Sequence, residues 1–307
     1  MLTTDVLIPV YRPGKRLSVL LNSLKEQSYP IHKIILMNTE KQYFPKGLDG
    51  KYENMEVHHL TKAEFDHGGT RDRGIRLSDA DVVVCMTQDA LPADRFLIEN
   101  LLKPFSDSGV WAAYARQLPA EDCREVERYT RGFNYPEESR VKGKEDLPEL
   151  GIKTFFCSNV CAAWRRDKYL ALGGFVKKTI FNEDMILAGS LIQQGGQIAY
   201  CADAKVIHSH NYSALQQFHR NFDLAVSQTM HPEIFAEIRS ESEGIRLVKK
   251  SARHCLQIGK PWLIFQVITQ SAGKFLGYRL GRRYRSLPRN ILLWCTMNQS
   301  FWQGEES

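Results

Sequence analysis

An uninterrupted apolar run in the first third of the chain constrains its fold most. Residues 82–86 read Val-Val-Val-Cys-Met, which is typical of a strand buried on both faces of a parallel sheet. The run stops at Thr87-Gln88-Asp89, and open α/β sheets bind ligands beyond the carboxyl ends of their strands. Asp89 either binds a ligand there or only caps a helix expected over residues 93–103. We favour the ligand role, because polar residues follow other predicted strands too.

The order of the flanking segments predicts a doubly wound α/β domain. Residues 6–11, 34–37 and 57–60 read as strands, and residues 17–24 carry leucines at helical spacing. Strand, helix, strand is the usual opening of a doubly wound sheet. No GxGxxG motif follows the first strand and the chain has no Walker lysine, so neither a dinucleotide-binding fold nor a P-loop ATPase is supported.

A glycine-rich segment and a long polar excursion follow. Residues 65–74 read Phe-Asp-His-Gly-Gly-Thr-Arg-Asp-Arg-Gly, and paired glycines let the backbone approach a ligand closely. Arg71, near the start of a helix expected over residues 70–78, could hold a diphosphate or a base carbonyl; an ion pair with Asp72 is the alternative. Residues 117–150 are polar and contain three prolines, which indicates a lid or acceptor loop.

Two further polar groups lie in the second half of the chain. Glu183 and Asp184 precede an apolar stripe and therefore begin a predicted helix, where acidic residues are common for dipole reasons alone. His208 and His210 are one residue apart on an extended segment, so their side chains point the same way and could share a metal or a phosphate. Either histidine alone also has a structural explanation.

The net positive charge of the chain comes from its C-terminal segment. Residues 240–307 hold eleven Lys and Arg against four Asp and Glu, a net +7, whereas the whole chain carries +6. This distribution argues against a general nucleic-acid binder and favours a local anionic partner. Basic residues, aromatic residues and apolar faces alternate in this tail, which reads as interfacial helices on an anionic membrane leaflet. The alternative is a helical cap packed on the main domain with a solvated basic face.

Other features of the sequence bear on its location. The chain has no run of about eighteen apolar residues, so we expect no transmembrane helix. Residues 1–5 lead directly into the first predicted strand, so we expect no signal peptide. The seven cysteines are scattered and form no CxxC pair, as in a cytosolic protein with reduced thiols. We therefore expect a cytoplasmic protein held peripherally on the inner face of the cell membrane.

Four motifs in order make residues 4–230 resemble the GT-A glycosyltransferases of family 2, and most of all their rhamnosyltransferase-like branch. The motifs are residues 65–71, 87–90, 182–184 and 208–210. The resemblance implies an α/β GT-A fold, Rossmann-like, with a mostly parallel sheet, flanking helices and a C-terminal helical region. It also suggests three parts: a nucleotide-sugar-binding half over residues 1–116, an acceptor-binding and catalytic half over 117–235, and a basic amphipathic helical tail over 236–307.

The resemblance implies roles for individual residues. Asp89 would be the surviving aspartate of the family's DxD motif and would hold Mg²⁺ or Mn²⁺ on the donor diphosphate, with His208 or His210 approaching that metal. Asp184 would be the catalytic base, with Glu183 beside it. The donor would be bound by Pro9, Val10, Tyr11, Asn38, Arg71 and Gln88, and the sugar or acceptor would lie near Ser158, Asn159, Arg165 and Arg166. The chain departs from the family in three places. Thr87 replaces the first acid of DxD, and Asn38-Thr39-Glu40 replaces an acidic Asp-x-Gly-Ser segment. Thr70-Arg71-Asp72 stands where Thr-Arg-Asn is more usual.

The chemistry of sugar transfer requires the same residue types. A divalent cation on oxygen ligands neutralises the leaving diphosphate, and a carboxylate accepts the proton of the acceptor hydroxyl. One base without a second carboxylate nucleophile suits a single displacement with inversion. We predict a metal-dependent inverting glycosyltransferase that moves L-rhamnose from dTDP-rhamnose to a lipid-linked oligosaccharide in bacterial surface polysaccharide synthesis.

Three alternatives remain open at this point. The donor could be a UDP-hexose in an enzyme of the same family. The chain could also be a non-catalytic sugar-binding or scaffolding protein with a degenerate GT-A fold, although Asp89 and Asp184 are both present. A nucleotidyltransferase would have a glycine-rich signature with a lysine after the first strand, and residues 11–15, Tyr-Arg-Pro-Gly-Lys, match this poorly.

Overall fold

The computed structural model of the protein describes residues 1–48, 50–236 and 241–303. These residues form two compact units. The first unit comprises residues 1–118, 135–177 and 183–208, and the second comprises residues 119–134, 178–182 and the described residues from 209 onward. Because both units are built from separate segments, the chain passes between them repeatedly.

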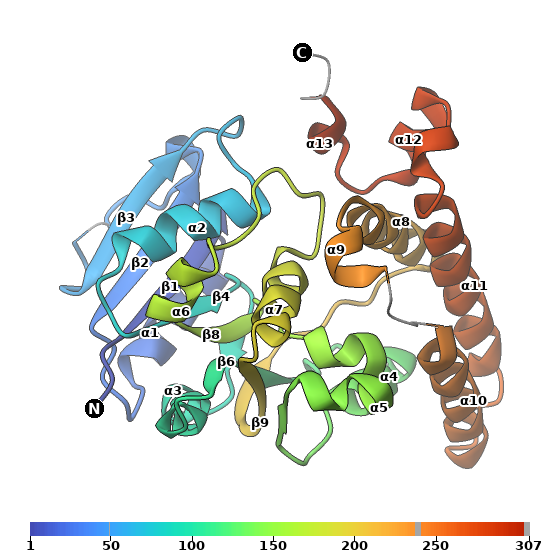
Figure 1. The fold of residues 1–307 in the computed structure, drawn as a ribbon, viewed down its shortest axis with the longest axis horizontal. Helices are drawn as coiled ribbons and strands as arrows, with labels where there is room; N and C mark the ends of the chain where they lie inside the picture. The colour runs from blue at the N-terminus through green and yellow to red at the C-terminus, as the bar shows by residue number, and fades with distance from the viewer. Residues whose placement is uncertain (49, 237–240, 304–307) are drawn as a thin grey trace. The chain divides into compact units, whose positions relative to one another are not determined.

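The first unit is built on one sheet, in which the described residues form nine strands (Figure 1). The order is β3-β2-β1-β4-β8-β6-β9-β5, with β7 paired to β9. The strands are β1 Thr4–Tyr11, β2 Lys33–Thr39, β3 Met55–Leu60, β4 Val82–Met86, β5 Leu91–Pro92, β6 Val110–Leu118, β7 Arg140–Lys142, β8 Cys161–Arg165 and β9 Gln197–Ile207.

Strand direction decides which residues meet at each edge of this sheet. Strands β1, β2, β3 and β4 are parallel, β8 is antiparallel to both β4 and β6, and β9 is parallel to β6. Strands β1, β2, β3, β4, β6 and β9 therefore end at one edge, which we call the carboxyl edge, and β8 begins there. The prediction of a mostly parallel α/β sheet is confirmed.

The strand predicted over residues 82–86 is confirmed as β4, at the centre of the sheet. All five of its side chains are fully buried, as a continuous apolar run requires. Two expectations near it are wrong. The helix expected over residues 93–103 begins only at Leu97, because residues 91–92 pair with β9 as β5. Residues 197–201 and 205–207 both read as short strands in the sequence, but the structure joins them into one strand, β9, with an irregularity in its pairing to β6.

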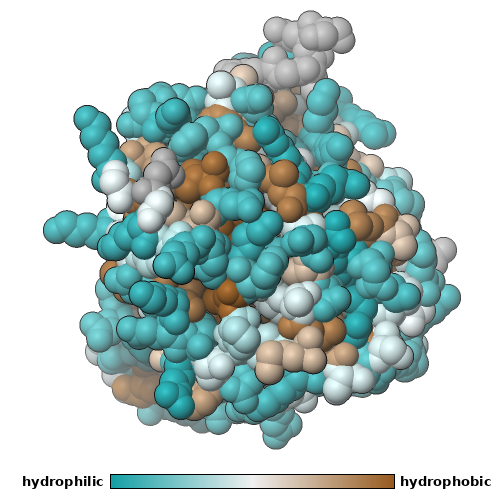
Figure 2. Space-filling view, turned by 90° about the vertical axis from the view of Figure 1, so that its left-hand side faces the viewer, coloured by the Kyte–Doolittle hydropathy of each residue, from teal (hydrophilic) through white to brown (hydrophobic). Residues whose placement is uncertain are grey.

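Helices flank the sheet in the first unit. They are α1 Lys15–Lys25, α2 His67–Leu77, α3 Leu97–Leu102, α5 Leu147–Leu150, α6 Arg166–Ala171 and α7 Glu183–Gln193, with 3₁₀ helices at Lys41–Tyr43, Lys103–Ser106, Lys144–Asp146 and Gly151–Phe155. The leucines of α1 are buried at helical spacing, as predicted. One face of the molecule is drawn in Figure 2; it is mainly hydrophilic, and its hydrophobic residues form small separate patches.

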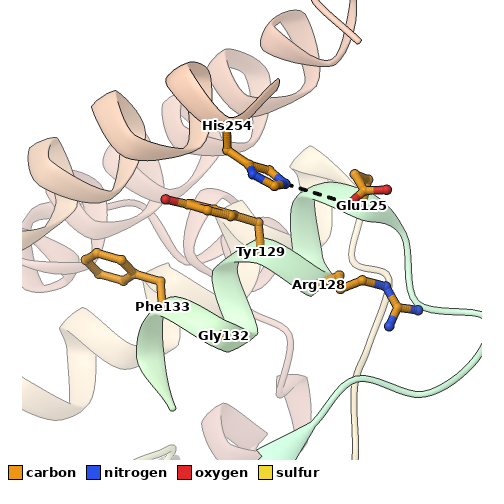
Figure 3. Close-up of a pocket in the computed structure, with 6 residues that line it drawn as sticks. All are labelled: Glu125, Arg128, Tyr129, Gly132, Phe133 and His254. Carbon is orange, nitrogen blue, oxygen red and sulfur yellow. Dashed lines mark ion pairs between the residues drawn. The ribbon is translucent and has the colours of Figure 1, made fainter. Parts of the chain in front are cut away.

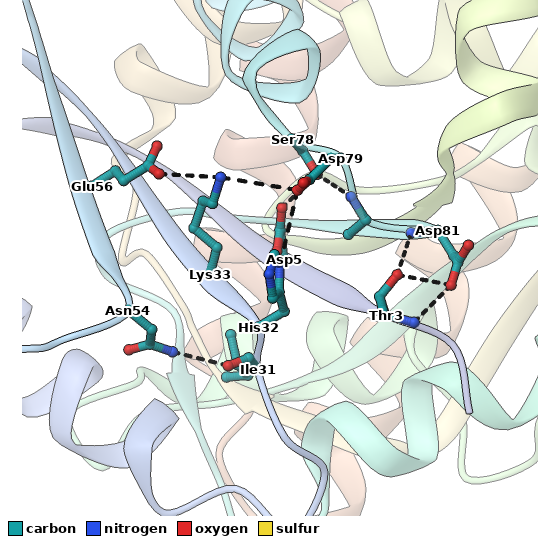
Figure 4. Close-up of polar contacts among 11 residues, drawn as sticks. Thr3, Asp5, Ile31, His32, Lys33, Asn54, Glu56, Ser78, Asp79 and Asp81 are labelled. Atoms are coloured by element: carbon teal, nitrogen blue, oxygen red, sulfur yellow. Dashed lines mark hydrogen bonds and ion pairs between the residues drawn. The ribbon is translucent and has the colours of Figure 1, made fainter.

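The edge opposite the carboxyl edge is closed by polar contacts (Figure 4). Asp5, which is fully buried, accepts hydrogen bonds from Ser78 Oγ at 2.6 Å and from His32 Nδ1 at 2.9 Å. Thr3 donates from both its amide and its hydroxyl to Asp81 at 2.8 Å. These groups satisfy one another, so we regard this edge as structural.

The second unit is helical. Its helices are α4 Glu125–Asn134, α8 Ala214–Met230, α9 Pro232–Phe235, α10 Glu241–Gln257, α11 Leu263–Gly281, α12 Arg289–Cys295 and α13 Gln299–Gln303, with a 3₁₀ helix at Tyr284–Ser286. The predicted C-terminal helical region is confirmed, although residues 237–240 and 304–307 of the predicted tail lie outside the described residues. The excursion of residues 117–150 is not a plain loop, because it contains α4, β7 and α5. No helix in the described part of the chain has the length and apolar character needed to span a bilayer.

Glycines allow α8 and α11 to pack closely. Gly273, Gly277 and Gly281 recur every fourth residue along α11, and each faces the backbone of α8. A Cβ atom on Gly277 would lie 2.1 Å from the carbonyl oxygen of Phe218. Any larger residue at this position would therefore push the two helices apart.

Candidate active site

The carboxyl edge gathers most of the polar residues singled out in the sequence. Asp89 lies three residues after β4, His208 directly follows β9, and Ser158 and Asn159 lie within three residues of the start of β8. Because β8 runs against its neighbours, its beginning meets their ends. Residues from three distant parts of the sequence thus reach one edge of the sheet.

Asp89 and His208 form a candidate metal centre. Their side chains are 3.6 Å apart between Asp89 Oδ2 and His208 Nε2. Gln117 Nε2 donates to Ser158 Oγ at 3.2 Å, so its Oε1 faces His208 Nδ1 at 3.0 Å. That contact places the imidazole proton on Nδ1 and leaves the Nε2 lone pair facing the Asp89 carboxylate. Two electron-pair donors facing each other suit a shared cation.

His210 follows two residues after His208 and belongs to the second unit. Two residues span at most about 7 Å, so the chain itself keeps the two histidines close. The His210 ring packs against Tyr212 with ring centroids 5.1 Å apart. Gln117, the partner of His208, was missed in the sequence analysis. Its only signal there is a polar residue one position before the end of an apolar strand.

Glu183 forms a buried ion pair at the start of α7. Its Oε1 lies 3.0 Å from Arg71 Nη1, and both side chains are at most one-tenth exposed. Arg71 Nη1 also donates to the carbonyl oxygen of His67 at 3.0 Å. Burial raises the pKa of Glu183, but the charges of Arg71 and His67 outweigh burial, so the pKa is lowered overall. Glu183 is therefore ionised and paired with Arg71.

The pKa of Asp184 is shifted in the opposite direction to that of Glu183. Its Oδ2 accepts a hydrogen bond from the Asn159 amide at 3.0 Å and its Oδ1 accepts one from the Met185 amide at 2.8 Å. Burial, and then the negative charge of Glu183, raise the pKa of Asp184 despite these bonds and despite Arg71. Two adjacent carboxylates with pKa values pushed apart are typical of a site that uses one of them as an acid or base.

Four of the six predicted donor-binding residues lie where β1 and β4 end, whereas Asn38 lies in β2 and Arg71 in α2. Pro9, Val10 and Tyr11 are the last three residues of β1. Gln88 holds Tyr11 in place, because its Oε1 accepts from the Tyr11 amide at 3.1 Å and its Nε2 donates to the Tyr11 carbonyl at 3.0 Å. Tyr11 is more than one-third exposed and its ring meets Tyr43 edge-on at 6.1 Å, which leaves an aromatic surface at this edge.

Unsatisfied polar atoms mark the same edge. Among the described residues, the buried oxygens Asn38 Oδ1, Thr39 Oγ1 and Thr87 Oγ1 have no hydrogen-bond partner. Asn38 and Thr39 end β2, and Thr87 directly follows β4. Because buried polar groups are nearly always hydrogen-bonded, these three atoms are available to a polar ligand at this edge, although buried atoms elsewhere, such as Thr4 Oγ1 and Trp302 Nε1, also have no partner.

The two remaining arginines lie elsewhere, so their predicted place near the sugar is wrong. Arg165 pairs across the sheet with Val82, the first residue of β4, and Arg166 directly follows it. Since β8 is antiparallel, its four steps of about 3.3 Å carry the chain away from the carboxyl edge. Arg165 Nη2 donates to the Phe105 carbonyl at 2.8 Å, which is a structural contact.

Comparison with known proteins identifies the family. The family model "Glycosyl transferase family 2" matches residues 5–173. The chain is 38% identical over 301 residues to the O-antigen chain rhamnosyltransferase RfbN of Salmonella typhimurium, covering 97% of this chain and 96% of that protein. It is 36% identical over 302 residues to the O-antigen chain rhamnosyltransferase WbaN of Salmonella anatum, covering 97% and 95%.

Solved structures agree on the fold. The mannosyltransferase PcManGT from Pyrobaculum calidifontis, in complex with GDP-Man and Mn²⁺, matches with a TM-score of 0.56 at 15% identity, covering 98% of this chain and 84% of that one. S. aureus TarS 1-349 in complex with UDP-GlcNAc matches with a TM-score of 0.53 at 14% identity, covering 92% and 91%. At such identities the likeness establishes the GT-A fold alone. Together with the near full-length relatives and the matched model, it shows that this chain is a glycosyltransferase and belongs to glycosyl transferase family 2.

Proposed function

We propose that the protein transfers L-rhamnose from dTDP-rhamnose, with inversion, to a lipid-linked oligosaccharide in the synthesis of a bacterial surface polysaccharide. The observation that carries the proposal is the similarity, over nearly the whole chain, to two proteins named as O-antigen chain rhamnosyltransferases. The carboxyl edge supports it, because a candidate metal centre, a candidate base and unsatisfied polar atoms lie at one edge of the sheet.

Asp89, His208 and His210 are proposed to hold the divalent cation. When bound, such a cation supplies charge neutralisation on the donor diphosphate. Mg²⁺ prefers oxygen ligands throughout, whereas imidazole nitrogen suits transition metals, so this set of ligands favours Mn²⁺. Gln117 fixes the tautomer of His208 and thereby keeps Nε2 available as a ligand.

Asp184 is proposed to be the general base. Its raised pKa gives it the proton affinity that a base near neutral pH needs. Glu183 is committed to Arg71, so it is not available as a second nucleophile, which supports a single displacement. The Asn159 amide orients Asp184, and Ser158 lies beside it in the chain, where sugar or acceptor is proposed to bind.

The donor is proposed to lie along the ends of β1, β2 and β4. Pro9, Val10 and Tyr11 would contact the base, and Asn38 would use its unsatisfied oxygen. Gln88 would act by holding the Tyr11 backbone. On this basis residues 1–116 supply most donor contacts and residues 117–235 supply the base and the acceptor contacts. Arg71 is proposed to act through Glu183.

The second unit is proposed to contact the inner face of the cell membrane. Large apolar side chains on α11 and beside it are exposed, among them Trp262 at 67% and Phe265 at 74%. Exposed apolar residues within a segment of net +7 suit an anionic membrane surface. Binding to phosphatidylglycerol vesicles that weakens with added salt would support this contact, and equal binding to neutral vesicles would contradict it.

A panel of nucleotide sugars tests the proposed reaction. We expect hydrolysis and transfer with dTDP-rhamnose and Mn²⁺, and little with UDP-hexoses. Turnover confined to a UDP-hexose would keep the enzyme class but replace the donor. No turnover of any nucleotide sugar, combined with binding of a glycan, would overturn the assignment of a working base and metal centre.

A further inference from the structure

The second unit contains a groove that the transfer mechanism does not use (Figure 3). It has a volume of about 450 Å³ and lies where α4 meets α10, and its lining residues are Glu125, Arg128, Tyr129, Gly132, Phe133 and His254. The rings of Tyr129 and His254 are stacked with centroids 4.3 Å apart and an angle of 19°. Phe133 lies one helical turn after Tyr129, so both rings are on the same face of α4.

A cationic hollow on α10 adjoins this groove. It has a volume of about 370 Å³ and is lined by Ile245, Arg246, Lys249, Lys250 and Arg253. Two of these cations face the aromatic wall, because Lys250 Nζ lies 5.4 Å and Arg246 Cζ 6.0 Å from the centre of the Phe133 ring. The aromatic and the cationic surfaces are therefore continuous, and we call them together the α4–α10 groove.

Three cations of the α4–α10 groove have no carboxylate partner among the described residues. In the part of the chain that the structure describes, no carboxylate forms an ion pair with Lys249, Lys250 or Arg253. The acid in the groove, Glu125, is already engaged by Lys260 at 3.2 Å and by His254 at 3.8 Å. Cations without counter-charges in a hollow attract an anion, and phosphate is an anion that lysine and arginine bind well.

The aromatic rings of the groove add a second requirement on the ligand. The face of an aromatic ring carries partial negative charge, so it attracts the C–H-rich face of a sugar ring. A flat bilayer surface would use the cations but not a concave wall of rings. A glycan joined to its lipid through phosphate has both chemical groups side by side.

We propose that the α4–α10 groove binds the phosphate-linked end of the acceptor, with phosphate on Lys249, Lys250 and Arg253 and the first sugar against Tyr129 and Phe133. The proposal rests on the proposed function in taking the acceptor to be a lipid-linked glycan. It adds a recognition site in the second unit, separate from the residues that hold the donor and the base.

The test compares two acceptors with two matched variants of the full-length chain. One acceptor carries the glycan on a short-chain lipid diphosphate, and the other carries the same glycan on a neutral alkyl chain, both in detergent micelles. The groove variant is Lys249→Gln, Lys250→Gln and Arg253→Gln. The control variant is Arg282→Gln, Arg283→Gln and Arg285→Gln, which removes the same charge from three exposed positions outside the groove.

We expect the groove variant to raise KM for the diphosphate acceptor about tenfold or more, the effect of losing roughly one charge-assisted hydrogen bond. KM for the neutral acceptor, KM for the donor, and kcat are expected to stay unchanged, and the control variant is expected to behave as wild type. Phe133→Leu is expected to weaken both acceptors, because it removes a sugar contact. Binding of each acceptor without donor, measured by calorimetry, is expected to change in the same way.

The other outcomes are distinguishable. Equal KM values for the groove and control variants with the diphosphate acceptor would overturn the proposal. So would a groove variant that keeps its KM in micelles but loses more binding to phosphatidylglycerol vesicles than the control, because the bilayer would then be the occupant. Failure of the wild type to transfer rhamnose would count against the proposed function, whereas calorimetry with the diphosphate acceptor would still decide whether the groove binds it.

Discussion

Replacing Glu183 with glutamine tests whether Asp184 is the base and Glu183 only shifts the pKa of Asp184 and pairs with Arg71. The change keeps shape and removes one negative charge. Glu183 raises the pKa of Asp184 and Arg71 lowers it. In Glu183→Gln the repulsion is lost and Arg71 has no counter-charge, so both changes lower the pKa of Asp184. A base works in its ionised form, so we expect the acid limb of the pH–rate profile to move to lower pH.

The same substitution has a structural cost that can be worked out from the geometry. At 3.0 Å the Arg71–Glu183 attraction is roughly 5 kcal/mol with an effective dielectric constant of about 20. Removing one partner of a buried pair leaves the other charge buried, which costs about 3–5 kcal/mol. The Arg116–Glu137 pair is equally short at 2.9 Å, but Glu137 is 86% exposed. Glu137→Gln is therefore expected to cost below about 1 kcal/mol.

Two measurements check this reasoning. Single-turnover transfer as a function of pH, at a temperature where the variant is folded, gives the acid limb, and urea unfolding gives the loss of stability. An acid limb that does not move would mean that Asp184 is not the base. A loss of stability no larger than that of Glu137→Gln would mean that the Arg71–Glu183 pair is not a buried ion pair in solution.

Three further changes have defined outcomes. Asp184→Asn is expected to bind donor with metal but to lose transfer by roughly two to four orders of magnitude in single turnover, and near-normal transfer would mean that another residue is the base. Because the pKa of Asp184 is raised by folding, the stability of the wild type falls as pH rises toward that pKa. The variant is therefore also expected to have a higher Tm than wild type at pH 8 but not at pH 4. Asp89→Ala is expected to abolish metal-dependent nucleotide binding in calorimetry with Mn²⁺, and unchanged affinity would exclude Asp89 as a ligand. Gly277→Ala is expected to destabilise the protein by about 1–3 kcal/mol in urea unfolding, because it disturbs the α8–α11 packing. The control Gly244→Ala, where a Cβ meets no atom within 4 Å, is expected to be neutral or stabilising, and equal effects of the two changes would refute the packing argument.

Local sequence patterns predicted the elements but not all of the contacts. The valine run of β4 and the leucines of α1 were recognisable because their periodicity reflects burial. Asp89 was placed correctly after β4 for the same reason. Strand direction leaves no comparable local signal, so the antiparallel course of β8 and the resulting position of Arg165 could not be predicted.

Contacts between residues that are distant in the sequence could not be predicted either. The sequence suggested Asp72 as a partner for Arg71, because the two are adjacent. The structure instead pairs Arg71 with Glu183, and Asp72 with Arg76 at 2.9 Å. The sequence placed Glu183 and Asp184 side by side, but the raised pKa of Asp184 depends first on its burial, and burial appears only in the folded chain.

The reversed strand β8 also affects how such an enzyme can be altered. A parallel neighbour needs a crossover of a dozen or more residues, whereas an antiparallel strand can be entered from the edge where its neighbour ends. The segment before β8 is anchored by Lys142, which donates to the carbonyl oxygens of Lys153 at 2.9 Å and Phe156 at 2.7 Å. Beyond that anchor the chain delivers Ser158 and Asn159 to the carboxyl edge. We expect that this short stretch can be exchanged between related enzymes without changing the strand order of the sheet, so an exchange there would test the proposed acceptor contacts of Ser158 and Asn159.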